Sequence, residues 1–160
     1  MTETLEILLR AHGSTSKGIV WAHNTHIGEH RATYMLEHGH VNIGGLARER
    51  LGVENVSLVG FGSYSGSVVA ASAWAGAVEV MNAPEAQVGS YEAIFHQASL
   101  SLNQKDFFLL FDRNKKDAQL SIRRGHRAIG VVYDPDRERN NYVPTELNKR
   151  YDAFVYFDHT

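Results

Sequence analysis

The sequence predicts an α/β fold in which a mostly parallel sheet carries helices on both faces. Several runs are apolar along their whole length, as strands buried on both faces are. Segments with helical periodicity separate these runs, and this alternation is typical of parallel sheets. The chain has 160 residues, of which 43% are apolar and 21% are charged, so it can bury a sizeable core. We therefore expect one α/β domain over residues 1–160.

The first third of the chain predicts a helix, a strand and a second helix. Leucines recur at helical spacing over residues 2–11, which indicates a short amphipathic helix. The apolar run 18–23 predicts the first strand, and the polar, histidine-rich stretch 24–41 predicts a loop or a broken helix. Asn42 is a suitable N-cap for a helix that ends at Leu51.

The rest of the chain predicts two helices among further strands. Ser90 is a suitable N-cap for a helix to about Ala98, and the charged stretch near 117–124 predicts another. Residues 134–143 predict a polar loop. The expected strands are 56–61, 67–74, 77–81, 107–111, 128–133 and 153–157.

Charge and composition argue against several classes of protein. The net charge is −2 and the basic residues are spread along the chain, whereas nucleic-acid grooves and membrane surfaces need clustered positive charge. No apolar run approaches the roughly 20 residues of a membrane span. Glu3 and Glu6 stand where a signal peptide would be basic, and without cysteine there are no disulfides or thiolate ligands. We expect a cytoplasmic protein that binds neither nucleic acid nor membrane.

Two histidines stand at the carboxyl end of the predicted first strand, where α/β proteins bind ligands. An imidazole with a pKa of about 6.5 suits acid–base work, so His23 and His26 are the candidate catalytic residues. With His30 they also form a spacing that suits zinc or manganese. In the alternative interpretation His23 is a strand-end histidine bonded to backbone, and His26 is solvated. The sequence leaves these interpretations open.

Polar side chains near the two histidines are candidates for substrate binding. Asn24 and Arg31 are chosen by proximity alone. The glycine-rich segment 60–66 predicts a tight turn rather than a phosphate loop, because no lysine follows it. Tyr64 in this turn can point into the same crevice.

Glu92 and His96 are spaced one helical turn apart, which predicts an acid–imidazole pair on a helix surface. Such pairs contribute only a few tenths of a kcal/mol, and a surface contact is the simpler interpretation. The histidines in loops or at element ends are given no role; they are His12, His38, His40, His126 and His159.

Stretches along nearly the whole chain resemble the erythromycin esterase family, in the family's order. They are residues 20–26, 42–44, 48–50, 58–66, 89–92, 128–133, 142–144, 151–153 and 157–158. The resemblance implies an α/β fold and hydrolysis of ester bonds, including the macrolactone of erythromycin, by water activated on histidine. No metal or other cofactor is implied.

The resemblance also implies roles for individual residues. His23 and His26 match a histidine pair that lines the family's active site. His23 would polarise water or stabilise the developing oxyanion, and His26 would hold water or substrate. Tyr64, Tyr91 and Glu92 lie on matching segments and join Asn24 and Arg31 as candidate substrate-binding residues.

The resemblance covers only the C-terminal half of the family, whereas the histidine regarded as the general base lies in the earlier half. We therefore expect a fragment, a shortened relative, or a chain completed by a homo-oligomer or by a complementing N-terminal half. A sheet without its neighbours would expose an edge or an apolar patch.

Three functions remain open from the sequence. The first is hydrolysis of a small-molecule ester or macrolide, as in antibiotic resistance. The second is a non-catalytic binding or oligomerisation module that lacks the family's base. The third is a metal-dependent hydrolase using His23, His26 and His30. The resemblance favours the first.

Overall fold

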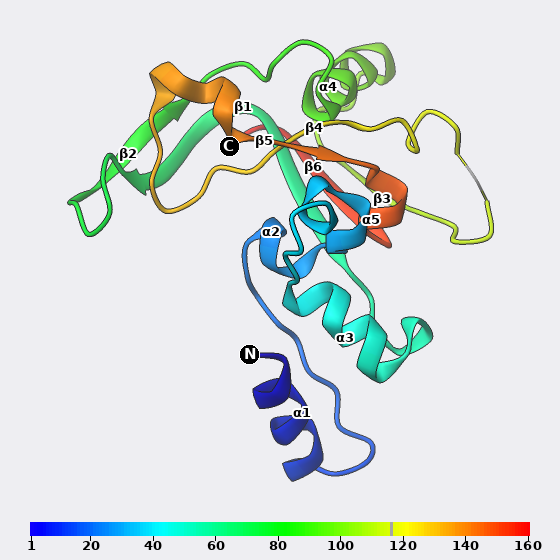
Figure 1. Ribbon diagram of the computed structural model, residues 1–160. Coiled ribbons are helices and arrows are strands. Elements are labelled where there is room, and N and C mark those ends of the chain that lie inside the picture. The colour runs from blue at the N-terminus through cyan, green and yellow to red at the C-terminus, as the bar shows by residue number, and fades with distance from the viewer. Residues whose placement is uncertain (116) are drawn as a thin grey trace.

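The computed structural model describes residues 1–115 and 117–160. A four-stranded sheet with the strand order β2-β1-β6-β3 forms its centre (Figure 1). The strands are β1 (Val59–Ala71), β2 (Val78–Ala83), β3 (Phe107–Leu110) and β6 (Ala153–His159).

The sheet is mixed, so the prediction of a mostly parallel sheet is wrong. β1 and β6 are parallel, but β2 pairs antiparallel with β1 and β3 pairs antiparallel with β6. Residues 72–77 join β1 to β2. So short a connection joins only antiparallel neighbours, because a parallel crossover needs about a dozen residues or more.

Most of the apolar runs form strands, and two do not. The runs at 77–81, 107–111 and 153–157 are confirmed as strands, and those at 56–61 and 67–74 contribute to the long β1. The runs 18–23 and 128–133 are irregular, apart from one bridge between Val132 and Ala71, so these two predictions are wrong. A strand needs a neighbouring backbone to pair with, and an apolar run alone does not provide one.

A second, two-stranded sheet was not expected from the sequence. β4 (Arg124–Arg127) pairs antiparallel with β5 (Tyr142–Thr145). The predicted helix near 117–124 is wrong, because these residues form turns that lead into β4. The sequence of β4 is Arg-Gly-His-Arg, which has no apolar alternation and so carries no strand signal.

The two helices predicted from their caps are confirmed. Asn42 accepts a backbone N–H at 3.0 Å at the start of α3 (Ile43–Leu51), and Ser90 accepts one at 3.2 Å at the start of α4 (Tyr91–Leu102). The predicted N-terminal helix is also confirmed, and of the loop or broken helix expected over 24–41 the structure has the broken helix. The remaining helical elements are α1 (Thr2–Ala11), α2 (Asn24–Ile27), α5 (Leu147–Arg150) and the 3-10 turns η1 (His30–Ala32), η2 (Tyr34–Leu36), η3 (Val53–Asn55) and η4 (Pro135–Asn141).

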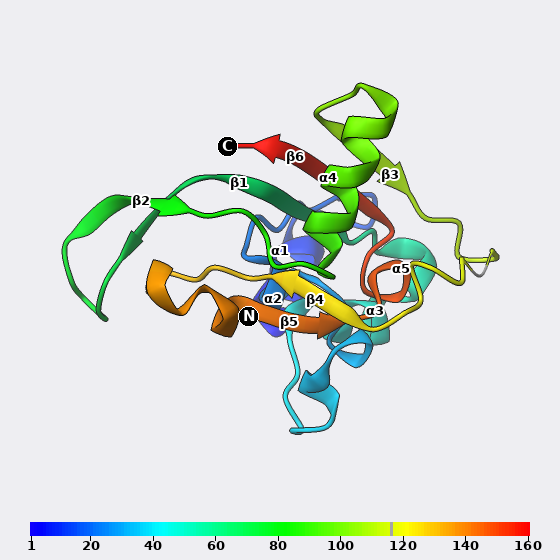
Figure 2. The same ribbon diagram turned by 90° about the horizontal axis from the view of Figure 1, so that it is seen from above.

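The main core lies between α4 and one face of the sheet, and Figure 2 shows α4 crossing β1 and β6. The ring centroid of Phe95 in α4 is 5.6 Å from those of Phe154 and Tyr156 in β6. Gly60 and Gly62 in β1 leave room for this layer, because a Cβ there would lie 2.6 and 2.7 Å from an aromatic ring atom. These glycines let the aromatic layer approach the strand closely.

The opposite face of β1, β6 and β3 is apolar and exposed, so the prediction of helices on both faces is wrong. Side chains alternate between the two faces of a strand, so Phe61, Phe108 and Leu110 point away from α4. They are 36%, 59% and 74% exposed. The exposed patch expected of a sheet without neighbours is thereby confirmed. We call this surface the open apolar face; its exposed side chains are Trp21, Val59, Phe61, Phe108, Leu110 and Phe157.

Candidate functional site

His23 is the N-cap of α2 rather than the end of a strand. Its Nδ1 accepts the N–H of Thr25 at 3.2 Å and lies 2.8 Å from the Thr25 hydroxyl. Its Nε2 lies 2.8 Å from the carbonyl oxygen of Ile129. Because a carbonyl only accepts, we assign the hydrogen to Nε2. Burial lowers the pKa of His23 below 6.5, so the ring is neutral at pH 7.

His26 lies on the same turn and is exposed. Its ring centroid is 6.3 Å from that of His23, with the two planes at 73°. It borders a hollow of about 290 Å³, whose other lining residues are Met1, Thr2, Val41, Asn42, Ile43 and Leu46. The structure thus brings the two imidazoles together, with one bound to the protein and the other accessible. The alternative interpretation agrees with this arrangement in the backbone bond of His23 and the exposure of His26, but not in the strand end expected at His23.

The side chain of Asn24 binds the backbone of β1. Its Nδ2 donates to the carbonyl oxygen of Phe61 at 2.6 Å, and its Oδ1 accepts the N–H of Phe61 at 3.1 Å. Since β6 pairs with the other edge of β1 here, the amide occupies the place of a neighbouring strand. The Asn24 carbonyl also accepts from the Arg150 guanidinium at 3.2 Å.

A buried acid–imidazole pair lies under α2. Glu92 of α4 and His126 of β4 are both 0% exposed, with Oε1 and Nδ1 2.5 Å apart. Glu92 also accepts the backbone N–H of Arg127 at 2.9 Å. The other nitrogen of His126 lies 3.2 Å from the Tyr151 hydroxyl and 3.4 Å from the Asn24 amide nitrogen. Sequence reasoning gave His126 no role, and the Arg-Gly-His-Arg context carries no signal for one.

The predicted surface pair of Glu92 with His96 is wrong. Glu92 faces the core, whereas Nδ1 of His96 pairs with Asp158 of β6 at 2.7 Å. The ring of Tyr64 stacks on His96 with centroids 3.7 Å apart. An i, i+4 spacing allows a contact but does not require it, and both side chains found partners on other elements.

The remaining candidates bind the protein itself. The Arg31 guanidinium makes two hydrogen bonds to the Glu29 carboxylate, at 2.8 and 3.0 Å. The buried Tyr91 hydroxyl lies 2.9 and 2.6 Å from the carbonyl oxygens of Leu120 and Ile122. Direct substrate contact by Arg31, Tyr64, Tyr91 and Glu92 stays a prediction.

The histidine spacing does not become a metal site. His30 is only 4% exposed, with its Nδ1 3.6 Å from Glu29, whereas His26 faces solvent. Over residues 1–115 and 117–160, no group of three or more His, Cys, Asp and Glu side chains could hold a metal ion. The metal-dependent alternative therefore has no ligand set in this part of the chain.

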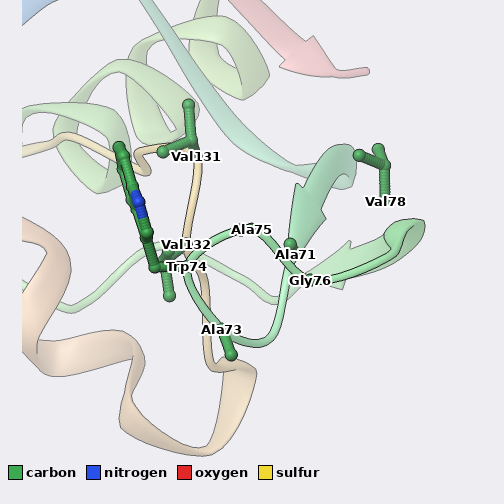
Figure 3. A pocket seen from close by; sticks show the side chains of 8 residues that line it. All are labelled: Ala71, Ala73, Trp74, Ala75, Gly76, Val78, Val131 and Val132. Carbon is green, nitrogen blue, oxygen red and sulfur yellow. The ribbon is translucent and has the colours of Figure 1, made fainter.

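A hollow of about 360 Å³ lies away from α2, between the β1–β2 turn and the segment before η4. Figure 3 shows Trp74 beside Val131 and Val132 at this hollow. The lining is apolar and holds no acid or base; it consists of Ala71, Ala73, Trp74, Ala75, Gly76, Val78, Val131 and Val132. The acid–base groups near α2 are thus the better candidate for chemistry.

A sequence model of the erythromycin esterase family matches residues 1–160. This chain belongs to the erythromycin esterase family. The resemblance to this family that was inferred from the sequence is thereby confirmed. In residues 1–115 and 117–160 of this erythromycin esterase family chain, no helix is long and apolar enough to cross a membrane.

Three solved structures have a similar fold. A succinoglycan biosynthesis protein superposes with a TM-score of 0.66 at 22% identity, covering 88% of this chain and 32% of its own. A protein from Bacillus cereus gives 0.64 at 20% identity, with 88% and 33% covered. A mutant of the erythromycin esterase EreC in its open conformation gives 0.61 at 18% identity, with 97% and 35% covered. This erythromycin esterase family chain thus spans about a third of the length of these neighbours.

Proposed function

We propose that this chain contributes the histidine part of an ester-hydrolysing site, acting on a small-molecule ester or a macrolactone. The supporting observation is the juxtaposition of His23 and His26, with ring centroids 6.3 Å apart, in a chain of the erythromycin esterase family. An accessible imidazole can hold water or a substrate oxygen through a ring nitrogen. His26 has that role in the proposal.

His23 stabilises the developing negative charge in this proposal. In ester hydrolysis, water adds to the carbonyl carbon and the carbonyl oxygen becomes an oxyanion, which hydrogen-bond donors stabilise. His23 is neutral and carries its hydrogen on Nε2, so it is such a donor. It must exchange the Ile129 carbonyl for the substrate oxygen, and a shift of the irregular segment 128–133 would allow this.

The general base belongs, in the proposal, to further polypeptide of the family fold that packs on the open apolar face. The three neighbours are about three times as long as this chain, and the exposed side chains named above on this face are apolar. The same face supports a second candidate function, a binding module without catalytic activity. Exposed apolar patches commonly mark protein interaction sites.

Hydrolysis of p-nitrophenyl acetate by the full chain tests the proposal, because the good leaving group of this activated ester lets water held on an imidazole react without the separate general base. We expect His26→Asn to lower the rate by about a hundredfold, since positioned acid–base groups contribute that much or more. His40→Asn replaces another exposed histidine and serves as the control. Equal rates for the two variants would remove His26 from the mechanism. No turnover of this ester would leave the binding module as the function.

A further inference from the structure

The buried Glu92–His126 pair is costly to place in a core. Two groups that can carry charge are both 0% exposed, and burial removes their hydration. Packed apolar side chains of similar volume often stabilise a fold as well as a buried ion pair does. Stability alone therefore does not explain why this pair is buried, and the groups that the pair contacts must be considered.

The pair fixes which nitrogen of His126 carries the hydrogen. Because the Glu92 carboxylate accepts at 2.5 Å, the hydrogen lies on Nδ1 of His126 and the lone pair lies on Nε2. Burial lowers the pKa of His126, so the ring stays neutral and Nε2 stays an acceptor. This lone pair lies 3.4 Å from the Asn24 amide nitrogen and 3.2 Å from the Tyr151 hydroxyl.

This acceptor also selects the orientation of the Asn24 amide. In the observed orientation Nδ2 has two acceptors, Phe61 O at 2.6 Å and His126 Nε2 at 3.4 Å, and Oδ1 accepts the Phe61 N–H. A flipped amide would turn Oδ1 toward both acceptors and lose all three hydrogen bonds. The neutral tautomer of His126 and the edge of β1 therefore favour the same orientation.

We propose that Glu92 and His126 are positioning residues for the histidine site: they hold Asn24, and through it the first turn of α2, against β1. Asn24 directly follows His23 and lies two residues before His26, so its attachment fixes the backbone that carries both imidazoles. The inference deepens the proposed function and rests on it, because it gives the site its positioning residues.

NMR of the unmodified chain provides the first test. The imidazole nitrogen shifts of His126 report the tautomer, and we expect the hydrogen on Nδ1. We also expect slow hydrogen exchange at the Phe61 amide, which lies beside an open strand edge and is protected by Asn24. A hydrogen on Nε2 of His126, or unprotected exchange at Phe61, would overturn the proposal.

Variants separate positioning from general stability. Glu92→Gln with His126→Leu removes the acceptor without leaving a buried charge, and Asn24→Asp replaces the amide donor by a carboxylate oxygen that faces the same two acceptors. We expect each to raise exchange at Phe61 at least tenfold and to shift the imidazole signals of His23 and His26. His96→Leu with Asp158→Asn breaks the other imidazole–carboxylate pair of α4 and is the matched control. Equal changes in the control, or no change in Asn24→Asp, would contradict the inference.

Activity provides an independent readout. If the wild-type chain hydrolyses p-nitrophenyl acetate, the Glu92→Gln/His126→Leu variant should lower kcat at least tenfold with little change in KM, because positioning affects the transition state more than binding. An unchanged kcat would overturn the positioning role. If the wild type has no activity, the proposed function fails, and the NMR measurements still decide whether the pair positions α2.

Discussion

The Nε2 of His23 donates a 2.8 Å hydrogen bond to the carbonyl oxygen of Ile129, which lies 106 positions later in the chain. This bond joins the N-cap of α2 to the segment 128–133, which pairs with Ala71 near the far end of β1. One imidazole therefore both starts a helix and holds together two segments beside the open edge of β1.

Substitutions at His23 should separate these two roles. Asparagine can cap α2, but its shorter side chain does not span to Ile129; alanine can do neither. We expect His23→Ala to lower the free energy of unfolding by about 2 kcal/mol, and His23→Asn by about 1 kcal/mol. Urea denaturation measures both values. Equal losses would show that the cap contributes nothing.

The stability of the chain should fall on mild acidification. Burial lowers the pKa values of His23 and His126 in the folded state, whereas both titrate near 6.5 when unfolded. Below pH 6.5 the unfolded state binds more protons, so this stability is complete above pH 6.5 and decreases as the pH falls through the folded-state pKa values. For His126 the limiting slope is about 1.4 kcal/mol per pH unit.

Thermal unfolding between pH 8 and pH 5 checks this expectation. The Glu92→Gln/His126→Leu variant should have a shallower dependence of Tm on pH than the wild type. A Tm that is constant from pH 7 to pH 5 in the wild type would contradict the assigned neutral state of His23 and His126.

Gly44 should tolerate no side chain, because it marks the contact between α3 and α2. A Cβ at this position would clash with the backbone carbonyl of Ile27. We expect Gly44→Ala to lower the free energy of unfolding by about 3 kcal/mol, as overpacking does. At Gly130 nothing lies within 4 Å of an added Cβ. Gly130→Ala should therefore change stability by less than about 0.5 kcal/mol. Chemical denaturation of both variants tests the contrast.

The open apolar face should drive self-association of the isolated chain. Phe108 is 59% exposed on this face, so Phe108→Glu should weaken association and change the free energy of unfolding by less than about 1 kcal/mol. Leu102→Glu replaces a side chain that is 69% exposed at the end of α4 and is the control. Light scattering over a range of concentrations measures association. A wild type that stays monomeric at every concentration would remove the face as an interaction surface.

Part of the fold could be read from local sequence. Asn42 and Ser90 cap the helices they were expected to cap, because a cap depends on a side chain and on backbone N–H groups two or three residues away. Most apolar runs form strands, because the residues in them prefer extended backbone. The run 18–23 did not, because a strand also needs a partner, and Trp21 is 85% exposed.

The candidate site was only partly visible in the sequence. His23 and His26 are close in space because they are close in the chain, and the sequence by itself determined that. The partner of Glu92 lies 34 positions away in a polar strand, and the partners of Asn24 and His23 are 37 and 106 positions away. Tertiary structure alone decided these contacts, because hydrogen bonds between distant segments depend on how the elements pack. The packing bound His23 to Ile129, buried Glu92 and gave His126 its place beneath α2.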